Sequence, residues 1–278
     1  MVELLVANQM TRVRFPSPAP NTMIELYKNK PKRMFMFGCS FTSHTWPTYA
    51  NIIEHDTGIL CYNFGKGGVS NVYISNLIAQ CDAIYNFNSD DLVMVQFSGI
   101  NREDRLIDNE WINIYRVADD DFVKDCVNDE HSLMRDWANI HYIDTLLKYK
   151  QTQYHLLSMN KIDTIDLYDT KLIPSFFETL WNNDLAVKMA TNKTIHPYYD
   201  DCHPTIIESM AFLKQIFNHT WSSTTEDAII ESDMKLMGLI QAYYNGHYSF
   251  DEIDNLIYNT ISPIINFRIR NFDKRLIT

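Results

Sequence analysis

Short apolar runs separated by longer segments constrain the fold of this chain more than any other sequence feature. The runs at 34–37, 58–64, 92–97 and 154–159 are each compatible with one buried strand, and the last two are almost continuously apolar. Such runs are typical of parallel strands that are covered on both faces. Because the intervening segments show helical spacing, the sequence predicts an α/β fold with a central parallel sheet and right-handed crossovers.

The expected helices separate the chain into three regions. Helical spacing or proline at a first turn predicts helices at 47–55, 71–85, 132–149, 174–182 and 205–217. After Trp221, two capping-box patterns, Ser223–Glu226 and Ser249–Glu252, each precede further helical periodicity. We therefore expect a leader at 1–22, an α/β domain at 23–221 and a helical C-terminal extension at 222–278. The extension either packs on the domain or mediates assembly, for example as a homo-oligomer.

The leader differs in composition from the rest of the chain. It is proline-rich between Arg12 and Pro20 and lacks the pattern of a signal peptide. It also resembles the peptide obtained by translating through the 3′ end of a tRNA gene. Two interpretations stay open, a spurious leader with the true start at Met23 and a genuine disordered arm.

Glycine is scarce and clustered in this chain. Of eight glycines, five lie in three short segments, 37–42 (FGCSFT), 63–71 (NFGKGGVSN) and 96–101 (QFSGIN). Each segment follows an apolar run, and in open α/β sheets ligands bind outside the carboxyl ends of the strands. We expect the first segment to turn sharply into a helix whose N-terminus lies behind Ser40, so that the serine hydroxyl is exposed as a nucleophile.

A fourth segment, 200–204 (DDCHP), completes a recognisable order of residues. Ser, Gly, Asn and His in these four segments resemble the four blocks of the SGNH (GDSL-like) hydrolase family, over about 34–217. The resemblance implies a flavodoxin-like three-layer α/β/α sandwich. It also implies that the protein is an enzyme, a serine hydrolase of the carboxylic ester hydrolase class.

The resemblance assigns a role to each matching residue. Ser40 would be the nucleophile, His203 the base that removes its proton, and Asp200 the carboxylate that orients the imidazole. The backbone N–H groups of Ser40 and Gly68 and the side-chain amide of Asn101 would form the oxyanion hole. Each such donor lowers the barrier by roughly 3–4 kcal/mol.

Several departures from the family pattern leave alternatives open. Cys39 stands where the family usually has the Asp of Gly-Asp-Ser, and Arg102 follows the block-three Asn where Asp is common. Asp201 is a second candidate for the orienting carboxylate. Cys39 or Cys202 could act with the histidine as a Cys–His nucleophile. The missing second glycine of Gly-x-Ser-x-Gly argues against a standard α/β-hydrolase.

Composition excludes several classes of partner. A net charge of −11 argues against a nucleic-acid or anionic-membrane binder. No apolar run approaches the roughly 20 residues of a membrane span. The five cysteines form no CxxC pair, which indicates a reducing compartment. His44, His55, His196 and His203 match no metal-binding spacing, so we expect no metal and no cofactor. The predicted location is cytoplasmic or virion-associated.

These features together predict a serine esterase that hydrolyses a small acyl ester through an acyl-enzyme on Ser40. An O-acetyl group on a carbohydrate is the expected substrate, because tryptophan and tyrosine rings stack on sugars, although the same residues also serve ordinary cores. Two alternatives remain: an acyltransferase on the same fold, and a non-catalytic carbohydrate-binding or assembly module. Whether 102–150 forms a lid is also open. The tryptophans considered are Trp46, Trp111, Trp137 and Trp181.

Overall fold

The structure, a computed structural model, describes residues 23–100, 102–114, 129–165, 167–182, 184, 186–190, 202–267 and 275–276. The predictions for the leader at 1–22 concern residues outside these ranges. The proposed domain boundaries stay predictions.

The centre of the molecule is a four-stranded parallel sheet. Its strands are β1 (Arg33–Gly38), β2 (Leu60–Asn63), β3 (Asp91–Phe97) and β6 (Gln153–Ser158), in the order β2-β1-β3-β6. All seven residues of β3 are buried, as expected for a central strand that is covered on both faces. The predicted strands are confirmed, with ends that differ by one or two residues.

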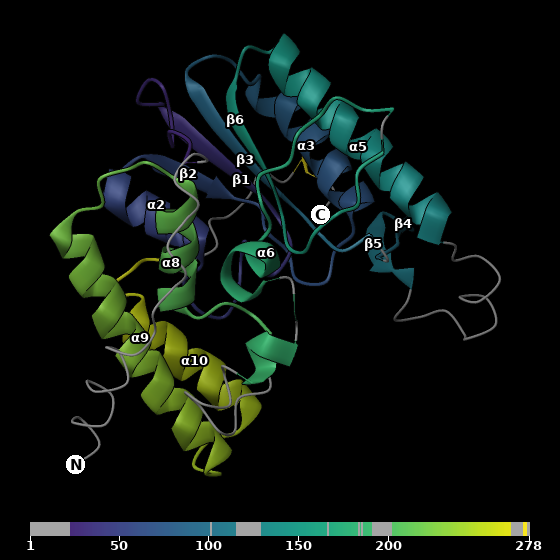
Figure 1. The fold of residues 1–278 in the computed structure, drawn as a ribbon. Helices are drawn as coiled ribbons and strands as arrows, with labels where there is room; N and C mark the ends of the chain where they lie inside the picture. The colour runs from purple at the N-terminus through teal and green to yellow at the C-terminus, as the bar shows by residue number, and fades with distance from the viewer. Residues whose placement is uncertain are drawn as a thin grey trace.

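Helices cover both faces of this sheet (Figure 1). Helices α2 (Tyr49–Thr57) and α8 (Ile206–Ile216) contact each other on one face, and α3 (Asn71–Tyr85) and α5 (Asp129–Tyr149) contact each other on the other. A short helix, α6 (Phe176–Trp181), contacts α8. The predicted three-layer α/β/α sandwich is therefore confirmed.

The C-terminal extension consists of α9 (Ser223–Tyr244) and α10 (Phe250–Ile261). Helix α9 lies against α2 and α8, and α10 lies against α9 (Figure 1). Buried residues of both helices, such as Leu236 and Ile257, belong to the same hydrophobic core cluster as the sheet. The extension therefore packs on the α/β layers, which is one of the two alternatives left open by the sequence.

Of the two predicted N-terminal caps in this extension, that of α10 is confirmed and that of α9 is displaced by one residue. The box at Ser249 and Glu252 is present as predicted. The cap of α9 is Ser222, whose side chain accepts from the Thr225 backbone N–H, so the prediction of Ser223 is wrong by one residue. Ser222 also donates its backbone N–H to Asp56, which ties the start of the helix to α2.

The sequence did not predict a β-hairpin that follows β3. Strands β4 (Asp104–Ile107) and β5 (Glu110–Asn113) pair antiparallel around Asp108 and Asn109, which have φ of 51° and 67°. Left-handed conformations at both central residues are the geometry of a type I′ turn, for which Asn and Asp are well suited. The strands are short, and their residues are mostly exposed or half-buried without the alternation that marks a strand with one buried face.

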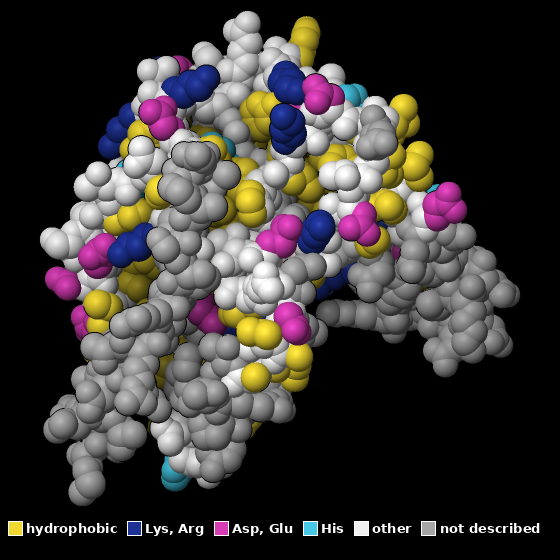
Figure 2. Space-filling view, viewed as in Figure 1, with side chains coloured by type: hydrophobic (Ala, Val, Ile, Leu, Met, Phe, Trp, Pro, Cys, Tyr) yellow, Lys and Arg dark blue, Asp and Glu magenta, His cyan; other side chains and the backbone are white. Residues whose placement is uncertain are grey.

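The described surface carries charges of both signs. Figure 2 shows basic and acidic side chains interspersed over the visible face. Among the helices of the described residues, none combines the length and hydropathy needed to cross a membrane.

Candidate active site

The topology of the sheet places the turn after β1 at a switch point. From β1 the chain moves to β2 on one side, and it then returns to β3 on the other side. In open α/β sheets, ligands bind at such a point, outside the carboxyl ends of the strands. Ser40 lies in this turn and is 9% exposed.

The turn does not lead directly into a helix, which corrects one expectation. Its backbone closes with the Thr42 N–H donating to the Cys39 carbonyl over 2.9 Å, and α2 begins only at Tyr49, after the cap Thr48. Pro47 disfavours helical conformation at Trp46, the residue before it, so α2 does not extend back through this position. A helix N-terminus therefore does not lie behind Ser40.

Gly38 allows this turn to lie directly against β3. A Cβ atom at Gly38 would be 2.1 Å from Thr42 Oγ1 and 2.9 Å from the Gln96 carbonyl oxygen. Thr42 Oγ1 occupies this space and donates a buried hydrogen bond to Gln96 Oε1 over 2.9 Å. A side chain at position 38 would displace the turn and with it Ser40.

Ser40 and His203 meet across the site, although 163 residues separate them. His203 Nε2 is 2.6 Å from Ser40 Oγ, within hydrogen-bond distance. The His203 ring is stacked on His44, with centroids 4.0 Å apart and an interplanar angle of 18°, and it also contacts Phe41. The structure thus brings together the predicted nucleophile and the predicted base. The sequence offers no signal for this contact, and His44 matches no metal-binding spacing in it.

The segment that follows His203 is anchored on both sides. Trp46 Nε1 donates to the Pro204 carbonyl over 2.9 Å. Thr205 caps α8 and forms a capping box with Glu208, so the helix follows Pro204 as predicted, with its first residue one position later than expected. These contacts fix the backbone one and two residues after His203.

The glycine-rich loop, which we define as 65–69, lies beside Ser40. The Lys66 backbone N–H donates to the Gly38 carbonyl over 3.0 Å, and a Cβ on Gly67 would be 3.9 Å from Ser40 Cβ. Gly68 has φ of 81°, a conformation that favours glycine. Asn113 of the hairpin donates from Nδ2 to the Gly68 carbonyl over 2.9 Å. The loop that carries the predicted oxyanion donor is thus held from two sides.

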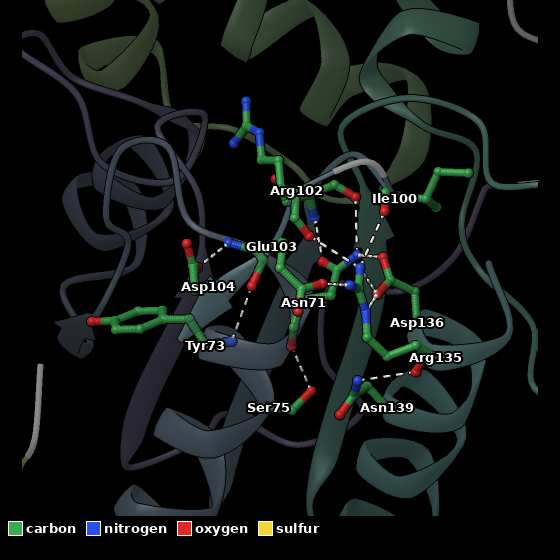
Figure 3. A network of polar contacts seen from close by, with 12 residues as sticks. Asn71, Tyr73, Ser75, Ile100, Arg102, Glu103, Asp104, Arg135, Asp136 and Asn139 are labelled. Atoms are coloured by element: carbon green, nitrogen blue, oxygen red, sulfur yellow. Dashed lines mark hydrogen bonds and ion pairs between the residues drawn. The ribbon is translucent and has the colours of Figure 1, made fainter. Parts of the chain in front are cut away.

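A polar network fixes the start of the loop after β3 (Figure 3). Asn71 accepts from the Ser98 backbone N–H at Oδ1 over 2.7 Å and donates from Nδ2 to Asp136 Oδ2 over 2.6 Å. Arg135 donates to the carbonyl oxygens of Ile100 and Arg102. Burial raises the pKa of Asp136 to about 6, partly offset by Arg135 and Asn71. Asn71 was part of the glycine-rich motif, but the sequence did not indicate this role.

Three of the predicted site residues lie outside the described residues: Asn101, Asp200 and Asp201. Asn101 follows Ile100 directly, and Arg135 holds the backbone on either side of that position. The assignments of Asn101 to the oxyanion hole and of either aspartate to His203 therefore stay predictions.

The structure bears on the Cys–His alternative at Cys39, whereas Cys202, which is half-buried and directly precedes His203, stays an alternative. Cys39 is fully buried and donates its S–H to Gln96 Oε1 at 3.5 Å, so it is directed to β3 while Ser40 faces His203. Within the described ranges, no group of three or more His, Cys, Asp or Glu side chains is placed to hold a metal ion.

The tryptophans considered as sugar-stacking residues differ in position. Trp46, Trp137 and Trp181 are buried in the core. Trp111, on β5, is half-buried and lines a cavity next to the glycine-rich loop. Of these four tryptophans, Trp111 is therefore the candidate for contact with a ligand.

Comparisons with known proteins add one distant structural similarity. No protein-family model matches the chain, and no curated protein matches it. Among solved structures, the chain is similar to a protein described as a gut microbial diltiazem-metabolizing enzyme, with 14% identity and a TM-score of 0.39. The similarity covers 70% of this chain and 48% of the other, so this chain spans about half the length of that protein. Similarity this distant says nothing about chemistry.

Proposed function

We propose that this protein is a serine esterase that hydrolyses a small acyl ester, with Ser40 as nucleophile and His203 as general base. The observation that carries the proposal is the 2.6 Å contact between Ser40 Oγ and His203 Nε2 at the switch point of the sheet. A serine hydroxyl needs an adjacent base to become an effective nucleophile, and this contact supplies one. The order of the four SGNH-like blocks supports the same assignment.

The reaction would proceed in two steps. His203 Nε2 takes the hydroxyl proton as Ser40 Oγ bonds to the ester carbonyl carbon, and the resulting imidazolium then protonates the departing alcohol as the carbon–oxygen bond breaks. In the second step His203 removes a proton from water as the water oxygen bonds to the acyl carbon, and the imidazolium returns a proton to Ser40 Oγ as the bond between the acyl carbon and Oγ breaks, which releases the acid. The backbone N–H groups of Ser40 and Gly68 would donate to the oxyanion, with the Asn101 amide as third donor. Asp200, or Asp201 in its place, would orient His203.

The first test is hydrolysis of p-nitrophenyl acetate. We expect Ser40→Ala and His203→Ala to lower kcat/KM by at least a thousandfold, because members of a catalytic triad act as a unit. Ser43→Ala, in the same turn, and Cys39→Ala should retain turnover. Wild-type activity no higher than that of Ser40→Ala would contradict the proposal.

A covalent probe distinguishes the nucleophile directly. A fluorophosphonate should label the wild-type protein on the peptide that contains Ser40, as identified by mass spectrometry, and should fail to label Ser40→Ala. Labelling of a cysteine instead would support the Cys–His alternative. Acyl transfer to added alcohols in preference to water would identify the protein as an acyltransferase.

A further inference from the structure

A cavity lies between the glycine-rich loop and the β4–β5 hairpin, immediately beside the candidate nucleophile. Its volume is about 240 Å³, and its lining includes Lys66, Gly67, Asp104, Trp111 and Asn113. Gly67, which lines the cavity, also adjoins Ser40, because a Cβ atom on this residue would be 3.9 Å from Ser40 Cβ. The cavity and the candidate nucleophile therefore share the glycine-rich loop as a neighbour.

One wall of the cavity is aromatic and firmly held. The Trp111 ring meets the buried Tyr73 ring edge-on, with centroids 5.6 Å apart and an interplanar angle of 88°. Lys66 Nζ lies 5.0 Å from the centroid of the same Tyr73 ring. Tyr73 thus contacts both the indole and the ammonium group, and edge-to-face geometry is one that aromatic pairs prefer.

The remaining polar side chains of the cavity are fixed by contacts to the glycine-rich loop and its neighbour. Asp104 accepts the Ser70 backbone N–H at Oδ2, 2.5 Å away, and Asn113 donates to the Gly68 carbonyl. A carboxylate offers about four acceptor sites and an amide offers two donors and an acceptor oxygen, so each has more capacity than these bonds use. The cavity thus combines an aromatic face with preorganised acceptors, an amide and a cation.

This combination suits a sugar ring better than an alkyl chain. One face of a pyranose presents C–H groups that stack on an indole, while its hydroxyls both donate and accept hydrogen bonds. Pockets for drug-sized ligands have volumes of about 300–1,000 Å³. A cavity of about 240 Å³ has room for a smaller ligand of about one ring.

We propose that this cavity binds the alcohol side of the ester, and that this alcohol is a single pyranose ring stacked on Trp111. The inference rests on the proposed esterase function and specifies its substrate class as an O-acylated sugar. Trp111 would be a specificity-determining residue, with Asp104 and Asn113 as partners of the sugar hydroxyls. The same hairpin contact that shapes the cavity, from Asn113 to Gly68, would couple sugar binding to the oxyanion loop.

The kinetic test compares two esters that share an acetyl group and differ in the alcohol. For each variant we would measure kcat/KM for 6-O-acetylglucose by acid release and for p-nitrophenyl acetate by absorbance. Trp111→Ala should lower the ratio of the first to the second by about tenfold, equivalent to about 1.4 kcal/mol. Trp111→Phe should lower it less, since it keeps an aromatic face. Ile107→Ala, an exposed change on the same hairpin, should leave the ratio unchanged. An unchanged ratio in Trp111→Ala would overturn the proposal.

A binding measurement separates this proposal from the esterase function. Saturation-transfer NMR with the methyl glycosides of glucose, galactose and N-acetylglucosamine would be carried out on Ser40→Ala and on Ser40→Ala/Trp111→Ala. Binding of at least one glycoside to the first variant and its loss in the second would support the cavity assignment, even if wild type failed to cleave p-nitrophenyl acetate. Absence of binding for all three in Ser40→Ala would overturn the assignment, even if esterase activity were confirmed.

Discussion

The ion pair between Lys188 and Glu208 is the interaction whose loss should destabilise the fold most clearly. The Lys188 side chain is 0% exposed and that of Glu208 is 9% exposed. Lys188 Nζ also lies 4.4 Å from the centroid of the Trp181 ring, and Glu208 accepts the Thr205 backbone N–H at the start of α8. The pair therefore joins the segment at 186–190 to the helix that follows His203.

Replacing only the lysine would leave a carboxylate in a nearly dry site. We expect Lys188→Met to lower the free energy of unfolding by about 3–5 kcal/mol, the usual cost of removing one partner of a buried pair. For a chain of this size, this corresponds to a decrease in Tm of about 6–20 °C. Urea denaturation and thermal denaturation followed by circular dichroism would measure both quantities.

Two further variants make this reasoning refutable. Lys188→Met/Glu208→Gln removes both charges and keeps an acceptor for Thr205, so it should recover at least half of the lost stability. Lys214→Met breaks a pair with Glu226 whose side chains are 46% and 43% exposed, and it should cost less than about 1 kcal/mol. The reasoning fails if Lys188→Met costs no more than Lys214→Met, or if the double variant is as unstable as the single one.

Three other predictions concern single sites. Burial raises the pKa of Asp233 to about 7. Its contribution to the free energy of unfolding is therefore present below pH about 4 and is lost as the pH rises through about 7. Relative to wild type, Asp233→Asn should become progressively more stable in denaturation experiments over that pH range, whereas the exposed control Asp227→Asn should not. In chemical denaturation, Gly38→Ala should lower the free energy of unfolding by about 1–3 kcal/mol, because its methyl group would overpack the turn. Gly238→Ala lies inside a helix with open space around it and should raise the free energy of unfolding by about 0.5–1 kcal/mol. Equal effects of the two variants would contradict the close approach described for Gly38. His44→Ala removes the ring that is stacked on the candidate base. This variant should lower kcat for p-nitrophenyl acetate by about tenfold with little change in KM. An unchanged kcat would show that the stacking does not position the base.

Much of the fold was readable from the sequence because its signals are local. The apolar run in β3 and the helical spacing of 71–85 depend on burial and periodicity along the chain, and α3 has the predicted bounds. The box at Ser249 was readable for the same reason. Errors arose where neighbouring residues compete for one role: Ser222 caps α9 although Ser223 also fits the pattern.

The hairpin at 104–113 and the cavity beside it could not be predicted from local sequence signals. Its strands are short and show no alternation of buried and exposed residues, and only the Asp-Asn pair at the turn offers a local signal. The aromatic content of the chain likewise could not distinguish Trp111 from three core tryptophans, because the same side chain serves either role and only its burial decides.

The sequence by itself determined the residue types at the candidate site, the order in which they occur and the sheet on which they lie. The tertiary structure decided which of them meet: Ser40 with His203 across 163 residues, and the glycine-rich loop with the hairpin. It also placed His44 on His203 and kept Cys39 away from that site. The physical reason is that propensity and periodicity act between near neighbours, whereas distances between distant side chains depend on how the strands order and how the layers pack.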